Sequence, residues 1–373
     1  MKFLHTADWQ IGRQYERFGP EDGPALAEAR LAAVERIAKL AVAENVDAVL
    51  VAGDVFDAQT VSDRTVRRLF NATEEFAGPW IMIPGNHDAA LAESVWTRAR
   101  RLHAVPDQVV LGLDPEPLLF PAQGFAVLPA PLTQRHTYGD LTAWFDTAKT
   151  PPDLVRIGLA HGSVEGILME GIDSPNPIAQ DRASRAQLDY LALGDWHGTR
   201  QISVRTWYSG TPEQDRFKDN GAGQVLLVEL AQPGAEPVVT PVATGQYPWL
   251  QWQQALLVPS DLDQFIQRLE QLGQPSVLQL ELSGQLDLSG DQRLRDALNQ
   301  AEARHRGLLY DASALRLYPT EDDIAELHAD GYVGEVIAEL RERQDGDEGE
   351  MAREALAILA RLLLDRKSPG EKS

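Results

Sequence analysis

Short apolar runs recur along the first part of the chain, and most of them end in a polar or glycine-rich turn. The clearest are "KFLHTAD", "AVLVAGD", "PWIMIPGNHD", "LVRIGLAHG" and "DYLALGDWHG". Two stretches of helical period, "GPALAEARLAAVERIAKLAVAENVD" and "VSDRTVRRLFNATEEF", separate the first three runs. Near-continuous apolar runs are typical of strands buried on both faces, and their alternation with helices predicts an α/β layered sheet.

A proline- and glycine-rich stretch at 231–248 follows the last such run, "QVLLVEL", and predicts a domain boundary. Beyond it the pattern predicts a small α+β domain. Its expected elements are a helix at 261–273, a strand at 276–284, a helix at 291–306 and a strand at 307–319. A chain of 373 residues also exceeds what one core usually supports. We therefore predict a first domain at 1–230, a capping domain at 231–320 and a helical segment at 321–373 that ends in a disordered tail, "SPGEKS".

The last predicted helix, at 351–367, carries an apolar face. Five residues lie on it at i, i+4 and i+7 spacing: Met351, Ala355, Ile358, Leu359 and Leu362. We expect this face to pack against its own protein, and docking of a partner is the alternative.

The composition excludes several kinds of chemistry. With no cysteine, the chain has no disulfide, no cysteine-bound zinc, no iron–sulfur cluster and no thiol nucleophile, so oxygen and imidazole must hold any metal. No apolar run is long enough to span a membrane, and the first residues lack the pattern of a signal peptide. We expect a cytoplasmic protein without a membrane partner.

The formal charge of -22 argues against a histone-like protein that coats nucleic acid, but it does not exclude a nuclease. Basic residues are grouped in two places, "SDRTVRRLF" and "TRARRLH". Their arginines are Arg64, Arg67 and Arg68 in the first group and Arg98, Arg100 and Arg101 in the second. Each group is either a phosphate-binding track or an ordinary solvated helix face.

Five polar clusters follow the predicted strands in order. They are "TADWQ" with Asp8 and Gln10, "AGDVFD" with Asp54 and Asp57, "PGNHD" with Asn86, His87 and Asp88, "AHG" with His161, and "LGDWHG" with Asp195 and His197. Each alone is a weak signal, because a Gly-Asp pair often forms a turn and a single histidine is usually structural. Since functional groups of α/β sheets gather beyond the carboxyl ends of strands, five clusters together predict one site.

The order of these clusters resembles the calcineurin-like metallophosphoesterases, whose pattern is D-x-H, GD-x-x-D, GNH-D/E, a lone histidine and GH-x-H. The segments "MKFLHTADWQIG", "AGDVFD", "IPGNHD" and "YSGTP" resemble more narrowly the SbcD-type DNA repair nucleases. This resemblance implies a layered β-sandwich flanked by helices, followed by a small α+β capping domain and C-terminal helices.

The resemblance also implies two metal ions, with two departures from the family pattern. Gln10 stands where the family has its first histidine, and Asp195 replaces the first histidine of the last motif. Carried over by position, one ion is held by Asp8, Gln10, Asp54 and His197, and the other by Asp54, Asn86, His161 and Asp195. An oxygen-rich set favours Mn²⁺, or Mg²⁺, over Zn²⁺.

Two divalent ions can share a bridging hydroxide and stabilise the charge that grows during in-line attack on a phosphodiester. By resemblance, His87 is expected to act at the phosphate or the leaving oxygen, with Asp88 orienting it. Asp57 is expected to fix a ligand or the loop from behind the metal ligands.

The sequence therefore predicts a manganese-dependent DNA phosphodiesterase, a repair nuclease that cuts single-stranded or distorted DNA, with internal cuts at least as expected as exonucleolytic ones. A small-molecule phosphodiesterase or phosphatase shares every motif. A decayed, non-catalytic scaffold for an ATPase is the alternative outside enzymology. The resemblance implies an SbcC-type ATPase partner and a homodimer, although no residue of this chain specifies either.

Overall fold

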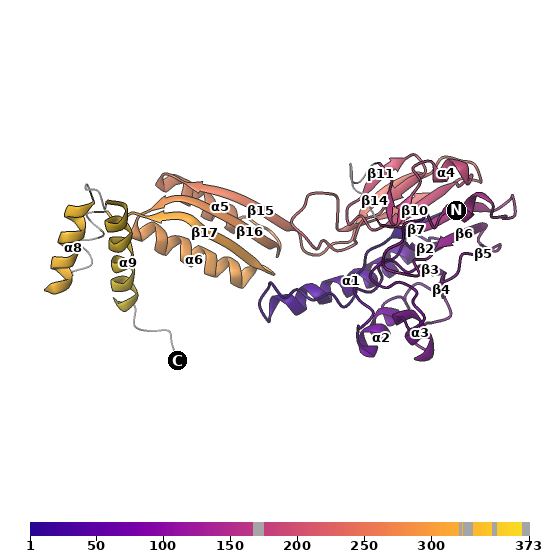
Figure 1. The fold of residues 1–373 in the computed structure, drawn as a ribbon, viewed down its shortest axis with the longest axis horizontal. Helices are drawn as coiled ribbons and strands as arrows, with labels where there is room; N and C mark the ends of the chain where they lie inside the picture. Colours follow the sequence, from indigo (N-terminus) through magenta and orange to yellow (C-terminus); the bar gives the residue numbers. More distant parts are fainter. Residues whose placement is uncertain (167–174, 321–322, 324–330, 345–348, 368–373) are drawn as a thin grey trace. The chain divides into compact units, whose positions relative to one another are not determined.

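The computed structural model describes the 373 residues except 167–174, 321–322, 324–330, 345–348 and 368–373 (Figure 1). The predicted tail and part of the acidic loop at 345–350 lie outside the described residues. The chain divides into two compact units, Met1–Pro248 and Trp249–Ser373.

Two six-stranded sheets form the first unit. The first sheet has the order β14 (Val238–Ala243), β13 (Gln224–Glu229), β1 (Lys2–Thr6), β2 (Ala48–Val51), β3 (Trp80–Met82) and β4 (Val109–Leu111). The second has the order β11 (Arg200–Ser203), β12 (Thr206–Tyr208), β10 (Tyr190–Gly194), β7 (Val155–His161), β6 (Phe125–Ala130) and β5 (Leu118–Phe120). Strands β1 to β4 are parallel, as are β6, β7, β10 and β12. Strands β8 (Ser163–Val164) and β9 (Pro177–Ile178) form a separate two-stranded parallel sheet.

The two sheets pack face to face. Phe3, Leu50 and Ile81 of the first sheet share one buried cluster with Val127 and Leu159 of the second. The alternate residues of β1 and β2 point to the opposite face, because side chains of a strand alternate between its two faces. Both faces of each sheet are therefore buried, which is why these strands appear as continuous apolar runs.

Helices cover the outer faces. Helices α1 (Asp22–Ala43), α2 (Asp63–Asn71) and α3 (Val95–Arg101) pack on the first sheet, and η1 (Ala143–Asp146) and α4 (Arg182–Arg185) on the second (Figure 1). Helix α2 begins where Ser62 accepts a hydrogen bond from the Thr65 N–H, a typical N-cap. The predicted layered α/β sandwich flanked by helices is confirmed.

The division between the units falls later than predicted. Strand β14 pairs with β13 from Gln224↔Ala243 to Glu229↔Val238, so residues 231–248 belong to the first unit and not to the cap. Glu213 anchors the end of this segment by accepting from the backbone N–H groups of Gln246 (2.8 Å) and Tyr247 (3.0 Å). The proline- and glycine-rich stretch contains the turn of a hairpin, which has the same composition as a linker.

The second unit begins with alternating strands and helices. Its elements are β15 (Trp249–Leu256), α5 (Pro259–Glu270), β16 (Val277–Leu286), α6 (Leu288–Arg304) and β17 (Leu308–Leu317). The three strands are parallel. Leu278, Leu280 and Leu282 alternate along β16 and share one cluster with Phe265 of α5 and Leu298 of α6. Both helices therefore cover the same face of the sheet.

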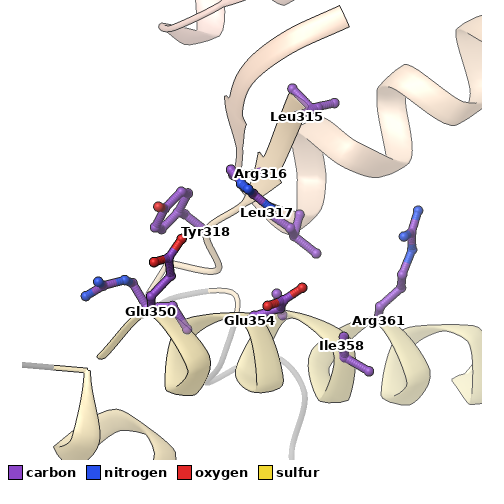
Figure 2. A pocket seen from close by; sticks show the side chains of 10 residues that line it. Leu315, Arg316, Leu317, Tyr318, Glu350, Glu354, Ile358 and Arg361 are labelled. Carbon is purple, nitrogen blue, oxygen red and sulfur yellow. The ribbon is translucent and has the colours of Figure 1, made fainter. Parts of the chain in front are cut away.

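Helices α8 (Tyr332–Arg343) and α9 (Gly349–Lys367) follow and contact one another. Helix α9 buries Leu356 and Ala360, and a hollow lies between it and the end of β17, lined by Leu317, Glu354 and Arg361 among others (Figure 2).

The expectation that the apolar face of α9 packs on its own protein is wrong for three of its five residues, whereas Ala355 and Leu359 are half-buried. Met351 is 67% exposed, Ile358 55% and Leu362 57%. The helix instead buries a neighbouring stripe that is rich in alanine. None of the helices in the described part of the chain combines the length and the apolar composition needed to cross a bilayer.

His5, which matches no metal motif, lies in the core of the sandwich. Its Nδ1 is 3.0 Å from the Tyr190 hydroxyl and its Nε2 is 3.1 Å from the Leu193 carbonyl oxygen. A neutral ring that accepts from the hydroxyl and donates to the carbonyl satisfies both contacts. Burial lowers the pKa of His5 to about 3, and the hydrogen bond to Leu193 offsets only part of that effect.

His5 should make the fold sensitive to acid. The unfolded chain binds a proton at His5 near pH 6.5, whereas the folded protein binds it only near pH 3, so stability falls as the pH drops below about 6.5. Between pH 7 and pH 5 the loss should be about 2 kcal/mol. In His5→Gln, which can keep both hydrogen bonds, the pH dependence of urea unfolding should be weaker by that amount. An identical pH dependence in the two proteins would contradict this.

Candidate metal centre

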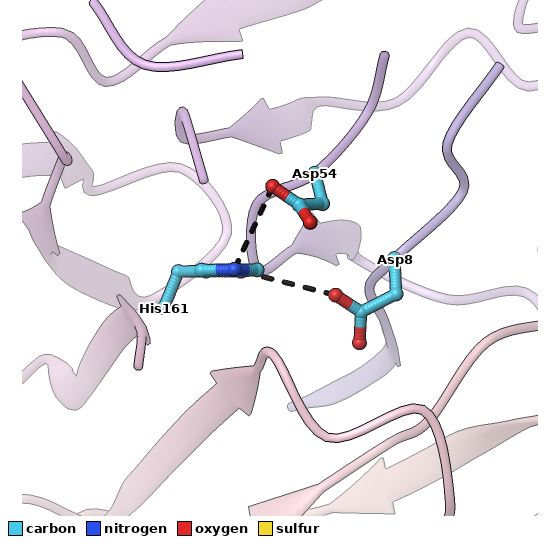
Figure 3. Close-up of side chains that lie close together, drawn as sticks. All are labelled: Asp8, Asp54 and His161. Atoms are coloured by element: carbon cyan, nitrogen blue, oxygen red, sulfur yellow. Dashed lines mark ion pairs between the residues drawn. The ribbon is translucent and has the colours of Figure 1, made fainter. Parts of the chain in front are cut away.

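The loops after five parallel strands meet at one end of the sandwich. His161 ends β7 and lies at the centre of the group: its Nε2 is 3.6 Å from Asp54 Oδ1, 3.7 Å from Asp195 Oδ1 and 2.9 Å from Asn86 Oδ1. Its Nδ1 is 3.9 Å from Asp8 Oδ1 (Figure 3). Residues far apart in the sequence thus form one cluster at the strand ends.

The other two predicted ligands join the same cluster. Gln10 Nε2 is 3.4 Å from His197 Nε2 and 3.5 Å from Asp54 Oδ2. The structure therefore brings together all seven residues that the sequence predicted as metal ligands. These are Asp8, Gln10, Asp54, Asn86, His161, Asp195 and His197.

Four of these residues have a left-handed backbone. The φ angle is 55° at Asp8, 44° at Gln10, 52° at Asp54 and 100° at Asp195. This conformation is uncommon for residues with a side chain and costs free energy, so it persists only where the surroundings impose it. The loops are shaped to turn polar side chains toward a common point at the expense of local stability.

Two glycines allow the loops to approach so closely. Gly53 has φ 88°, and a Cβ there would lie 2.4 Å from His161 Nδ1. A Cβ at Gly85 would lie 2.2 Å from Asp54 Oδ1. The glycines in "AGD" and "PGN" are therefore required by the packing of the polar side chains and not only by the turns.

Burial and mutual repulsion disturb the charges of this cluster. Burial raises the pKa of Asp8 to about 6, and it also raises the pKa of Asp195. Burial disfavours the charged form of His161, but Asp54, Asp8 and Asp195 outweigh it and raise the pKa of that imidazole to about 9. The carboxyl groups of Asp8 and Asp195 hold their protons more tightly than usual, and so does the imidazole of His161. Both effects indicate that the cluster lacks positive charge.

The donor set fits a divalent cation. Ligand atoms of Asp8, Asp54 and His161 lie within 4.8 Å of one another, and all three side chains are buried. His161 Nδ1 is 2.8 Å from the Ala52 carbonyl oxygen, so this nitrogen donates and Nε2 is left to face the carboxylates. Oxygen ligands with one imidazole suit Mn²⁺ or Mg²⁺.

His87 stands beside the cluster and is oriented by Asp57, not by Asp88 as predicted. Its Nδ1 is 2.8 Å from the Asp57 carbonyl oxygen, and its Nε2 is 3.9 Å from Asp54 Oδ2. The buried Asp88 carboxylate accepts instead from the backbone N–H groups of Gly85 (2.7 Å) and Phe56 (3.0 Å). Asp88 therefore holds the "PGNHD" loop in place, and burial raises its pKa to about 7.

The residues that contact the predicted ligands from outside the cluster were not predicted. Asp215 Oδ2 is 2.9 Å from His197 Nδ1 and 2.9 Å from Arg13 Nη1. Burial opposes its ionisation, but His197, Arg30 and Arg216 hold the pKa of Asp215 well below its usual range.

The buried Arg30 donates to the backbone carbonyls of Asp8 and Trp9, both at 2.7 Å, and so fixes the first loop. The only feature of the sequence that could have pointed to these residues is the neighbouring pair Asp215 and Arg216, which follows the "YSGTP" motif.

The two arginine groups lie on neighbouring helices. Arg67 on α2 donates to the Leu102 carbonyl at the end of α3 (3.2 Å), and Arg64 and Arg100 are exposed. Arg68 is paired with Glu28, and Arg101 lies 4.0 Å from Glu93. Arg98 differs, because its guanidinium donates to the carbonyls of Gln59 and Val61 and holds a loop.

The sequence comparisons agree with this geometry. Residues 1–227 match the family model of the calcineurin-like phosphoesterases, and the chain belongs to that family. The family supports a metal-dependent hydrolase, for which Asp8, Asp54 and His161 form a candidate metal site. The predicted resemblance is thereby confirmed.

Three similar proteins refine the comparison. The chain is 26% identical over 242 residues to the uncharacterized metallophosphoesterase YhaO of Bacillus subtilis. This match covers 62% of the present chain and 57% of YhaO. It is 24% identical over 338 residues to the SbcD subunit of the nuclease SbcCD of Bacillus subtilis, with 80% and 83% covered. Over 95 residues it is 41% identical to the corresponding protein of Rhodobacter capsulatus, with 24% and 22% covered.

Removal of His161 should weaken the response of the protein to manganese. In His161→Ala the ion loses its central nitrogen, so its affinity should fall at least about tenfold, and the stabilisation at a fixed, saturating concentration should fall by about 1.4 kcal/mol or more. Thermal unfolding with manganese and with a chelator measures this directly. His136→Ala, at an exposed histidine, should respond as the wild type does. Equal stabilisation of both variants would contradict the assignment.

Proposed function

We propose that this protein is a manganese-dependent phosphodiesterase that cuts DNA, with a preference for single-stranded or distorted substrates and for internal positions. The observation that carries the proposal is His87, whose Nε2 edge faces a buried carboxylate–imidazole cluster while its Nδ1 is fixed. A phosphodiester bound at that cluster has a proton donor beside it. The similarity to two proteins named as SbcD subunits of the nuclease SbcCD supports DNA as the substrate.

The chain's own residues would contribute position and proton transfer. A bound divalent ion polarises phosphoryl oxygens and lowers the pKa of water. The Nδ1–H of His87 donates to the Asp57 carbonyl, which leaves Nε2 to exchange a proton with the departing oxygen. The His87 backbone N–H donates to Asp54 Oδ1 (2.9 Å), so the imidazole and the cluster keep a fixed separation.

A basic surface on α2 and α3 would bind the DNA backbone. We define it by four exposed arginines: Arg64, Arg67, Arg100 and Arg101. Arg68 and Arg98 contribute less, because Glu28 neutralises the first and loop carbonyls hold the second. Since the whole chain is acidic, such a local patch supports contact at a limited site better than coating of long duplexes.

The exposed apolar face of α9 supports a partner protein. Met351, Ile358 and Leu362 are each more than half exposed on one helix, and large apolar surfaces of this kind mark interaction sites. The two SbcD relatives are named as one subunit of the nuclease SbcCD, so we propose an SbcC-type ATPase as the partner and a homodimer as the assembly.

His87→Ala should slow DNA cleavage by about 10² to 10⁴-fold, the range that general acid–base catalysis contributes, while manganese binding is unchanged. End-labelled single-stranded, duplex and hairpin oligonucleotides, digested with manganese, measure the rate and separate internal cuts from release of mononucleotides. Hydrolysis of nitrophenyl diesters and monoesters without any DNA cleavage would favour the small-molecule phosphodiesterase instead. A wild type inactive on every substrate would favour the scaffold.

Replacement of Arg64 or Arg100 by glutamine should weaken oligonucleotide binding and lower the salt dependence of the dissociation constant by about one counterion for each arginine replaced. Fluorescence anisotropy at several salt concentrations measures both. Arg185→Gln, at an exposed arginine of α4 paired with Asp146, is the matched control and should change neither. An unchanged salt dependence in Arg64→Gln and Arg100→Gln would remove these helices from the DNA-binding surface.

A further inference from the structure

The carbonyl oxygen of Gln10 is turned away from the predicted metal site. Arg13 Nη1 donates to Gln10 Oε1, three residues earlier in the chain. The amide nitrogen therefore points inward, 3.4 Å from His197 Nε2 and 3.5 Å from Asp54 Oδ2. An amide nitrogen donates two hydrogen bonds and has no lone pair for a metal. In this orientation Gln10 is not a ligand.

Arg13 cannot release Gln10 without cost. The same Nη1 lies 2.9 Å from Asp215 Oδ2, and the Arg13 side chain is only 28% exposed. A half turn of the Gln10 amide would place its NH₂ group against this guanidinium, donor against donor. The salt bridge to Asp215 thus fixes the direction of the amide.

The hydrogen bonds of His197 agree with this orientation. Asp215 Oδ2 is 2.9 Å from His197 Nδ1, so Nδ1 carries the proton and Nε2 keeps a lone pair. Arg216 Nη2 lies 2.7 Å from the same Nδ1, but the opposite tautomer would set two acceptors against one another at the Asp215 contact. The Nε2 lone pair then accepts from Gln10, and Asp54 Oδ2 can accept from the second amide hydrogen.

Asn86, the other amide in the cluster, is not held in this way. Its Oδ1 is 2.9 Å from His161 Nε2, and the reversed amide would place its nitrogen 3.2 Å from both Asp54 oxygens. In the described part of the chain, the hydrogen-bond partners of this amide are His161 in either orientation and Asp54 in the reversed one, and neither fixes the oxygen outward. A cation among Asp54, His161 and Asp195 can therefore orient Asn86 toward itself, whereas Arg13 opposes the same change at Gln10.

The geometry points to a centre with one divalent ion, in which the amide of Gln10, locked by Arg13 and Asp215, takes the place of the second. The ion would be held by Asp54, Asn86, His161 and Asp195. At the other position the amide nitrogen of Gln10 lies 3.4 Å from His197 Nε2 and 3.5 Å from Asp54 Oδ2, the two residues that would hold a cation there. The inference rests on the proposed function only for the identity of the ion, manganese.

Titration of the metal-free chain with Mn²⁺, followed by electron paramagnetic resonance and by the metal bound after gel filtration, tests this. Wild type should bind one ion and show the spectrum of an isolated Mn²⁺. Gln10→His, which restores an imidazole, should bind two ions and show a spin-coupled spectrum. Arg13→Met, which frees the amide to turn, should raise the affinity for a second ion by about tenfold or more. Arg36→Met is the control, because Arg36 is similarly exposed (33%) and is paired with Glu213.

A wild type with two coupled ions would overturn the inference, as would a Gln10→His protein that still binds one. An unchanged second-ion affinity in Arg13→Met would show that Arg13 does not lock the amide. These readouts require no substrate. A wild type that binds one ion and cuts no DNA would contradict the proposed function alone, and one that binds two and cuts DNA would contradict this inference alone.

Discussion

The backbone bonds between the loops after β1 and β2 are the constraint on which the site depends. The Asp8 N–H donates to the Gly53 carbonyl (3.1 Å), and the Gln10 N–H donates to the Asp54 carbonyl (2.8 Å). These two bonds place the first two acids of the cluster side by side. The backbone of these loops has left-handed φ angles at Asp8, Gln10 and Asp54, and the guanidinium of Arg30 donates to the Asp8 carbonyl. The backbone of the two loops therefore sets the geometry of the cluster.

This arrangement stores unfavourable free energy. Carboxylates buried at such short separations repel one another, and the strained loops add to the cost. A divalent cation bound there would offset the repulsion and would link metal binding to the folding of the first unit. The second unit has a separate core beneath its parallel sheet.

Much of the fold could be predicted because strands buried on both faces give an unmistakable pattern. The boundary at 248 could not, since a hairpin such as β13–β14 and a linker use the same prolines and glycines. The predicted ligands converge because the carboxyl ends of parallel strands do. The role of Asp57 could not be read from the sequence, because Asp88 adjoins His87 in "PGNHD" whereas Asp57 lies 30 positions before His87, in "AGDVFD". Arg13 and Asp215 were missed for a related reason: their partnership spans 202 positions and leaves no spacing to recognise.

The two departures from the family pattern, Gln10 and Asp195, are both consistent with a centre that holds one ion. A carboxylate at Asp195 adds negative charge around the surviving cation and strengthens its binding, while Gln10 removes a ligand from the other position. Asp8 has a structural role in such a centre. Its two carboxylate oxygens lie 3.1 and 3.2 Å from the backbone N–H of Asp195, and they hold the left-handed turn (φ 100°) that directs the Asp195 side chain inward. The residue that would bind the first ion then positions a ligand of the second, which explains why an acid there remains useful when the imidazole beside it is lost.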